Sequence, residues 1–184
     1  MKHRLAILAC LLFAVSGARA EWDPRGPVRD IDMHPDLDTT VKKPDAPAWE
    51  VSLPAFPKEA NLVEFYVGPT VRFRVYVDTA SLTVNGDEVR FAHVIKTAGG
   101  ATNVSYDGLR CSEYQRAIYA SGRPDGTWSR ARKSDWRVIN ESGVSGYFGA
   151  LAVDVLCSDN GRGGPAGTAE QLVKALKAAP NLRR

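Results

Sequence analysis

The chain has 184 residues, of which 44% are hydrophobic, and its 24 Lys and Arg residues outnumber its 21 Asp and Glu residues. Three of the basic residues, Lys2, Arg4 and Arg19, lie within the first twenty positions, where no acidic residue occurs. The rest of the chain therefore carries 21 basic and 21 acidic residues, and this balance excludes the general basic footprint of a nucleic-acid-binding protein.

The first twenty residues have the pattern of a secretory signal peptide. A basic start, MKHR, precedes the apolar run LAILACLLFAV, and Ala18-Arg19-Ala20 has the small-x-small form of a cleavage site. The run is shorter than the roughly 20 residues that a membrane-spanning helix needs, and no later segment is longer. We expect an exported chain without a transmembrane segment. Lipoprotein cleavage before Cys10 is the alternative, although it would leave only Leu5 to Ala9 as the apolar core.

Residues 21–60 are predicted to form an extended arm, with no regular core element as far as about residue 55. This segment shows no sustained period of a helix or a strand. It contains seven prolines: Pro24, Pro27, Pro35, Pro44, Pro47, Pro54 and Pro57. We therefore place the start of a folded domain at residue 61.

Strand alternation begins after the arm. In TVRFRVYVD one side of the predicted strand is apolar and the other is polar, with Val71, Phe73, Val75 and Val77 opposite Arg72, Arg74 and Tyr76. EVRFAHVIK repeats the pattern after the turn Asn85-Gly86-Asp87, so the two runs predict a β-hairpin. NVSYDGLRC, EYQRAIYASGR and residues 127–132 follow as further strands. The pattern predicts an antiparallel meander of about five strands.

A helical period appears only near the end of the chain. Phe148, Leu151, Ala152, Val155 and Leu156 have the spacing of a short amphipathic helix, although a buried strand is also compatible with so short a run. A Gly-rich link follows, and Thr168 with Gln171 predicts a capping box that opens a last helix through Ala178. Its apolar stripe is Ala169, Leu172, Val173 and Leu176. We expect an α+β fold: an antiparallel domain over residues 61–157, then the link and C-terminal helix over residues 158–184.

Cys10 belongs to the signal peptide, so Cys111 and Cys157 remain in the exported chain. An even pair of cysteines in an exported protein predicts a disulfide bond. Two free core thiols are the alternative.

Residue types that carry catalysis or bind metals are sparse. The Gly-rich stretch 161–167 lacks the Gly-Lys-Ser/Thr ending of a phosphate loop, and Ser145 fails the Gly-x-Ser-x-Gly pattern because Tyr147 stands at the second glycine position. The exported chain has only two histidines, His34 and His93, too few for a zinc site if the cysteines are paired. We predict no metal and no cofactor. His93 shares the face of Phe91, which favours a hydrogen-bonded core histidine.

Several segments of the domain together resemble a known family. The Asp-x-x-Ser-Leu element starts at Asp78, Tyr-Asp-Gly-x-Arg-Cys ends at Cys111, and Gly-x-x-x-Gly-x-Trp ends at Trp128. Over residues 60–157 this order resembles the CNP-one-like (CNP1-like) family of exported proteins from Gram-negative bacteria, which has no assigned activity. It is more distantly similar to surface-adhesin E-like proteins. The resemblance implies a periplasmic or outer-envelope location and an antiparallel sheet with helices. The Gly-rich tail after Cys157 departs from the family pattern.

The stretch DGTWSRARKSDW, residues 125–136, contains the main candidate binding surface. Alternation places Trp128, Arg130 and Arg132 on one face, where an aromatic ring could stack and guanidinium groups could bind carboxylate or phosphate. Arg72, Arg74 and Tyr76 occupy the polar face of the earlier strand. The structural alternative is that the arginine stems cover Trp128 at a sheet edge.

Two classes of function remain open from the sequence. The first is a non-catalytic envelope module that binds a protein, a glycan or an anionic envelope component. The second is a hydrolase that uses His93 with Asp78 or Asp107. We favour the first, because no catalytic set assembles in the sequence.

Overall fold

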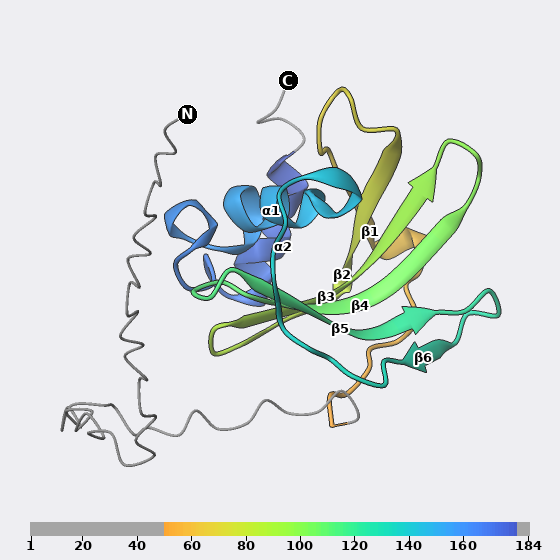
Figure 1. Cartoon of the computed structure of the whole chain (residues 1–184), viewed down its shortest axis with the longest axis horizontal. Coiled ribbons are helices and arrows are strands. Elements are labelled where there is room, and N and C mark those ends of the chain that lie inside the picture. Colours follow the sequence, from red (N-terminus) through yellow and green to blue (C-terminus); the bar gives the residue numbers. More distant parts are fainter. Residues whose placement is uncertain (1–49, 180–184) are drawn as a thin grey trace, which may run out of the picture. The chain divides into compact units, whose positions relative to one another are not determined.

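The computed structural model describes residues 50–179, so the predicted signal peptide (1–20) and arm residues 21–49 lie outside the described part. Strands β1 to β6 are neighbours in chain order in one antiparallel sheet, and β7 pairs with β5 (Figure 1). The strands are β1 (Leu62–Phe65), β2 (Phe73–Asn85), β3 (Glu88–Thr97), β4 (Thr102–Arg110), β5 (Gln115–Gly122), β6 (Trp128–Arg130) and β7 (Arg137–Val138). The prediction of about five strands is corrected to seven. The additional strands, β1 and β7, are four and two residues long, too short for alternation to mark them.

The predicted hairpin is confirmed as β2 and β3, which pair from Phe73 opposite Thr97 to Asn85 opposite Glu88. Val75 and Val77 are fully buried, whereas Arg74 is exposed, as the alternation predicts. The pairing register shifts between Asp78 and Thr83. There the Ser81 hydroxyl donates to the Asp78 carbonyl oxygen (2.7 Å) and accepts from the Ala92 backbone N–H (2.8 Å). A buried side chain thus replaces the ladder partner that the irregularity removes.

The helical segment before Cys157 covers one face of the sheet. Helix α1 (Tyr147–Leu151) continues into a π-helical turn, η3 (Ala152–Leu156), so the buried-strand alternative is wrong. Short 3-10 turns complete the described elements: η1 (Glu59–Asn61), η2 (Gly143–Ser145) and η4 (Asp159–Gly161). Phe148, Leu151 and Leu156 pack in the main core with the apolar face of β2 and β3.

The last helix, α2 (Ala169–Ala178), forms as predicted. The Thr168 hydroxyl accepts from the Gln171 backbone N–H, and the Gln171 side chain accepts from the Thr168 N–H, which completes the capping box. Leu172 and Leu176 are buried in the main core. The C-terminal helix is therefore docked on the domain, a point that the sequence left open.

A second, smaller core lies on the opposite face of the sheet and involves part of the predicted arm. Val51 is buried there with Tyr106 and Tyr119. Residues 50–58 contain no helix or strand, in agreement with the prediction for residues 50–55, but they are not a detached linker. We call residues 51–56 the strap, because this segment lies over the second core.

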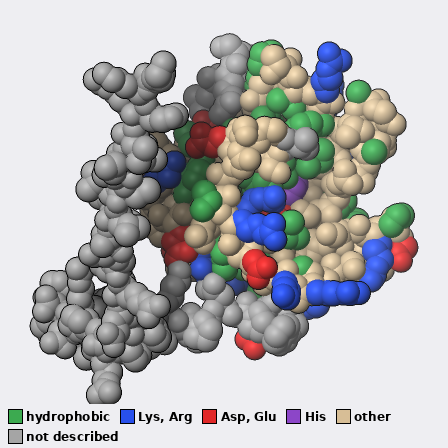
Figure 2. All heavy atoms as spheres, in the orientation of Figure 1, with side chains coloured by type: hydrophobic (Ala, Val, Ile, Leu, Met, Phe, Trp, Pro, Cys, Tyr) green, Lys and Arg blue, Asp and Glu red, His purple; other side chains and the backbone are tan. Residues whose placement is uncertain are grey.

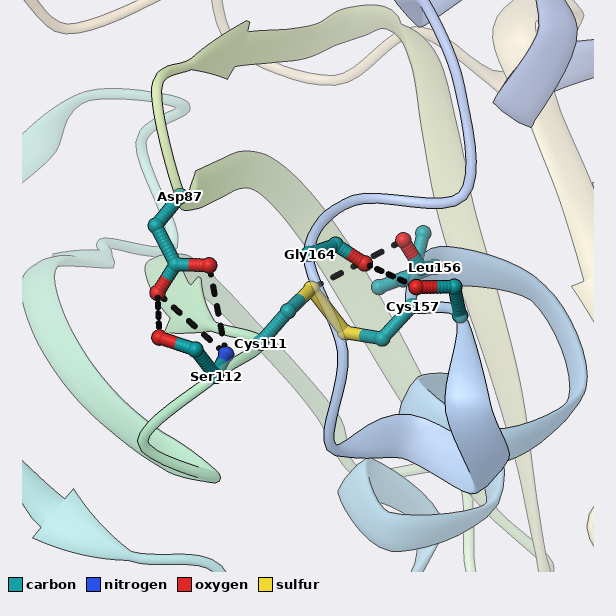
Figure 3. Close-up of a disulfide and its surroundings, with 7 residues drawn as sticks. Asp87, Cys111, Ser112, Leu156, Cys157 and Gly164 are labelled. Carbon is teal, nitrogen blue, oxygen red and sulfur yellow. Dashed lines mark hydrogen bonds between the residues drawn. A yellow bond between two sulfur atoms is a disulfide. The ribbon is translucent and has the colours of Figure 1, made fainter.

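The predicted disulfide is present. Cys111 follows β4, Cys157 follows η3, and their Cα atoms lie 5.5 Å apart. Figure 3 shows the carboxylate of Asp87 beside this bond, where it accepts from the backbone N–H (3.2 Å) and hydroxyl (2.6 Å) of Ser112. The bond ties the end of β4 to the helical layer across 46 residues of chain.

Replacing both cysteines with serine should lower the free energy of unfolding by about 4 kcal/mol, because the disulfide closes a 46-residue loop in the unfolded chain. Urea denaturation of the two proteins measures the difference. Adding a thiol reductant should destabilise the original chain and leave the double variant unchanged. Equal stability of both proteins under oxidising conditions would refute this assignment.

Candidate functional site

The predicted aromatic and basic residues of β6 contact the chain itself. The Trp128 indole N–H donates to the Pro54 carbonyl oxygen (2.9 Å), and the ring lies 5.0 Å from that of Phe56. Arg130 Nη1 donates to the Val51 carbonyl oxygen (2.8 Å). These contacts hold the strap on the second core. The first half of DGTWSRARKSDW therefore has a clear structural role.

The six predicted binding residues do not form one cluster. Arg130 lies opposite Ala120, which lies opposite Tyr106, and this row continues through β3 to Asp78 of β2. Arg74 and Tyr76 are on the same side of β2 as Asp78, so the shared face is as predicted. However, three strands separate the two groups. Arg74 is paired with Glu64 (3.7 Å), whereas Arg72 and Arg132 are exposed and lie outside the strands, before β2 and after β6.

The sheet face that packs against the main core holds a polar cluster around His93. The side chain of His93 is 3% exposed. Its Nε2 lies 2.7 Å from the Tyr147 hydroxyl of α1 and 3.4 Å from Ser105 Oγ of β4. Its Nδ1 lies 3.1 Å from Oδ2 of the fully buried Asp107. Burial raises the pKa of the Tyr147 hydroxyl far above its ordinary value, and Asp107 raises it further, so Tyr147 stays protonated and can donate to His93.

Asp107 connects this buried cluster to the surface. Its Oδ2 accepts a short hydrogen bond from the Ser105 hydroxyl, and its Oδ1 lies 3.8 Å from Nη1 of Arg116. The Arg116 guanidinium lies over the Phe148 ring, 4.3 Å from its centre, and the side chain is 24% exposed. One side of Arg116 therefore faces a buried carboxyl group, while its other side reaches solvent.

Asp78 cannot serve as a partner of His93. It occupies the opposite face of the sheet, since it lies opposite Ala92 in the register, whereas Val77 lies opposite His93. Burial raises the pKa of the Asp78 carboxyl group, although the Ala80 N–H and Ser81 partly oppose this effect. Its part in the β2 irregularity gives Asp78 a structural role.

The His93 cluster meets one condition of a catalytic base and fails two. His93 and Asp107 are close, as a hydrolase would require. Yet the carboxylate approaches Nδ1 outside the direction of an N–H hydrogen bond, so Nδ1 and Asp107 Oδ1 have no hydrogen-bond partner in the described part. The Tyr147 hydroxyl also occupies Nε2, the nitrogen that would have to accept a proton from a nucleophile. The cluster joins α1 to the sheet through the hydrogen bond between Tyr147 and His93.

The other motif residues also perform structural tasks. Gly108 follows Asp107 in β4, at a point where side chains from β3 and β5 approach the backbone. A β-carbon at this position would lie 2.8 Å from the Tyr119 ring of β5 and still closer to the carboxylate of Glu88 in β3. A β-carbon on Gly122 would lie 2.7 Å from Val104 and 3.0 Å from the ring of Phe56 in the strap. Both positions exclude larger residues because neighbouring groups already occupy the space.

A pocket of about 350 Å³ opens between β5 and residues 131–137, which we call the arch. The arch leaves β6 and runs along the edge of β5 to β7, and the chain then continues to α1 (Figure 1). Arg116, Ile118, Lys133, Asp135 and Arg137 line the pocket. Sequence reasoning missed this set. Its signal was the run of basic residues in ARKSDWR, of which only Ala131 and Arg132 fall within the strand predicted over residues 127–132.

A second hollow, of about 380 Å³, lies beside α1 and is lined mainly by apolar side chains such as Val67, Val71 and Phe73. The Tyr114 hydroxyl at its edge donates to Glu141 (2.7 Å). Burial, assisted by this carboxylate, raises the pKa of Tyr114 to about 12.

Within residues 50–179 no three His, Cys, Asp or Glu side chains are grouped as for a metal ion, and no helix there is long and apolar enough to cross a membrane.

Replacing Tyr147 with phenylalanine should lower the free energy of unfolding by about 1–3 kcal/mol, because the buried Nε2 of His93 loses its 2.7 Å partner. Chemical denaturation measures the change. The matched control is Tyr66→Phe, at an exposed tyrosine, which should stay within about 0.5 kcal/mol of the original chain. Equal effects of the two substitutions would show that the His93 cluster does not stabilise the fold.

Comparison with known proteins bears on the family only. No curated protein and no solved structure matches the chain, so the more distant resemblance to surface-adhesin E-like proteins stays a prediction. The three motifs, by contrast, all lie within one family match. This match also includes the Gly-rich tail as far as residue 177, so the expected departure of that tail from the family pattern is wrong. The model of the CNP1-like family covers residues 42–177, well over half of the chain, and the protein therefore belongs to the CNP1-like family.

Proposed function

We propose that the protein is an exported cell-envelope module that acts by binding and not by catalysis. The observation that carries the proposal is the position of the Tyr147 hydroxyl, which holds Nε2 of His93 at 2.7 Å inside the core. A general base must reach the proton that it removes, and this nitrogen is already occupied and buried. The structural roles of Asp78, Ser81 and Gly108 add support, because these motif residues organise the fold.

The hydrolase alternative rests on the proximity of three side chains. Ser105 is partly exposed, its Oγ lies 3.4 Å from His93 Nε2, and Asp107 lies on the other side of the imidazole. In a working triad the serine donates to the histidine and the carboxylate orients the opposite N–H. Here Ser105 donates to Asp107 instead, and Asp107 lies off the Nδ1–H direction. The set therefore lacks an activated nucleophile.

Export of the chain is part of the proposal. The pattern of residues 1–20 supports a cleaved signal peptide, and the pairing of Cys111 with Cys157 is in keeping with an oxidising compartment. The ligand is a protein, a glycan or an anionic component of the periplasm or outer envelope.

A fluorophosphonate probe distinguishes the two functions, because it modifies serine hydroxyls that a neighbouring base has activated. We expect no labelling of Ser105 in the folded chain beginning at Glu21. Intact-protein and peptide mass measurements detect the adduct, and a known serine hydrolase serves as the positive control. Stoichiometric labelling that disappears in Ser105→Ala would overturn the non-catalytic proposal.

A further inference from the structure

We propose that the pocket between β5 and the arch binds the acid group of a small organic oxyanion, with Arg116, Lys133 and Arg137 as the cationic groups. This inference rests on the proposed binding function and gives it a site and a ligand class. Arg116 comes from the sheet, and the other two come from the arch.

The walls of the pocket are fixed at both ends by backbone hydrogen bonds. At one end the Ala131 N–H donates to the Tyr119 carbonyl oxygen (2.8 Å). At the other end β7 pairs with β5, with Arg137 opposite Arg116, and the Ile139 N–H then donates to the Tyr114 carbonyl oxygen (3.0 Å). The space between the two attachments is therefore part of the fold, and a ligand would enter a pre-formed site.

Arg116 is held in place before any ligand arrives. Phe148 supports the guanidinium from the core side at 4.3 Å, and Asp107 lies 3.8 Å from Nη1, beyond hydrogen-bond distance. No acceptor among residues 50–179 takes a hydrogen bond from this guanidinium. An arginine with five donors and a fixed plane suits a carboxylate or phosphate, which can accept two of its N–H groups at once.

The charges around the pocket are not balanced by the surrounding carboxylates. Arg116 and Arg137 are direct cross-strand neighbours, an arrangement of like charges that costs stability. Within residues 50–179 neither Arg137 nor Lys133 makes an ion pair. Asp135 in the lining and the buried Asp107, 3.8 Å from Arg116, are two carboxylates against three cations. Figure 2 shows Lys and Arg side chains gathered on the lower part of the described surface, with isolated Asp and Glu side chains among them. A bound oxyanion would offset this repulsion.

The apolar part of the lining indicates an organic ligand. Ile118 lines the pocket together with the cations and is 39% exposed, a large fraction for an isoleucine on a sheet. A volume of about 350 Å³ is at the lower end of the range for small-molecule sites and exceeds what a bare oxyanion fills. We therefore assign the acid group to the three cations and an apolar body to Ile118.

Benzoate, its neutral counterpart benzyl alcohol and inorganic phosphate test the site. Each is titrated into the ¹⁵N-labelled chain beginning at Glu21, and backbone amide shifts are followed. We expect saturable shifts with benzoate around Arg116 to Ile118 and Lys133 to Arg137, weaker binding of phosphate, and no saturable shift with benzyl alcohol. If benzyl alcohol binds with the same affinity as benzoate, the proposal is overturned, because the charge of the ligand would then contribute nothing. If phosphate binds with the same affinity as benzoate, the result supports an oxyanion-binding site but shows that Ile118 does not contribute to it.

Lys133→Gln with Arg137→Gln removes two cations that make no ion pair in the described part, so this variant should fold normally. We expect benzoate to bind at least about tenfold more weakly, because the variant loses one or more charge-assisted hydrogen bonds to the ligand. The matched control is Arg72→Gln with Arg74→Gln, which removes the same charge near the other edge of the sheet and should leave the affinity unchanged. Equal losses in both variants, or no saturable shift in the original chain, would overturn the site. If benzoate does not bind as expected and the fluorophosphonate probe leaves Ser105 unlabelled, only the pocket is refuted. If the probe labels Ser105, the proposed binding function itself is refuted.

Discussion

The burial of Asp107 in the core, with His93 beside it, is the constraint on which the rest of the domain depends. A carboxyl group and an imidazole are tolerated in an apolar interior only when neighbouring groups compensate for lost water. Ser105 of β4 and Tyr147 of α1 supply hydrogen bonds, and Arg116 of β5 places its charge 3.8 Å from Asp107. Nδ1 of His93 and Oδ1 of Asp107 have no hydrogen-bond partner in the described part. The cluster therefore fixes the helical layer against the sheet. It also holds one side of the Arg116 guanidinium against the core, and Arg116 is at the same time one of the residues that line the pocket.

Strand alternation and helix caps carried most of the fold prediction. β2, β3 and α2 follow directly from residue periodicity and from the capping box of Thr168 and Gln171, because each depends on local sequence. The register shift after Asp78 did not, since Ser81 satisfies a backbone group of β3 that is eleven residues away. The strap was also missed: Val51 is apolar, but only its contact with the distant Tyr106 and Tyr119 reveals a buried position.

The candidate site shows the same division between local and distant information. His93 could be placed in the core from its parity with Phe91, and Asp107 was a reasonable partner. Its key neighbour, Tyr147, is 54 residues from His93 and carries no local signal. The face of Trp128 and Arg130 was identified correctly, yet its occupant is the chain's own strap. The cations of the pocket escaped prediction because the arch departs from strand geometry after Ala131, where alternation no longer indicates direction.

We propose that His93 is a buried structural residue and not a catalytic base, and its chemical accessibility distinguishes the two roles. Carbethoxylation of the chain beginning at Glu21 with His34→Gln leaves His93 as the one imidazole to be modified. Because the side chain is 3% exposed and Nε2 contacts the Tyr147 hydroxyl, we expect His93 to stay unmodified in the folded protein and to react once the chain is unfolded. Modification of the folded protein at the rate of the unfolded chain would show that His93 is accessible and not a buried structural residue.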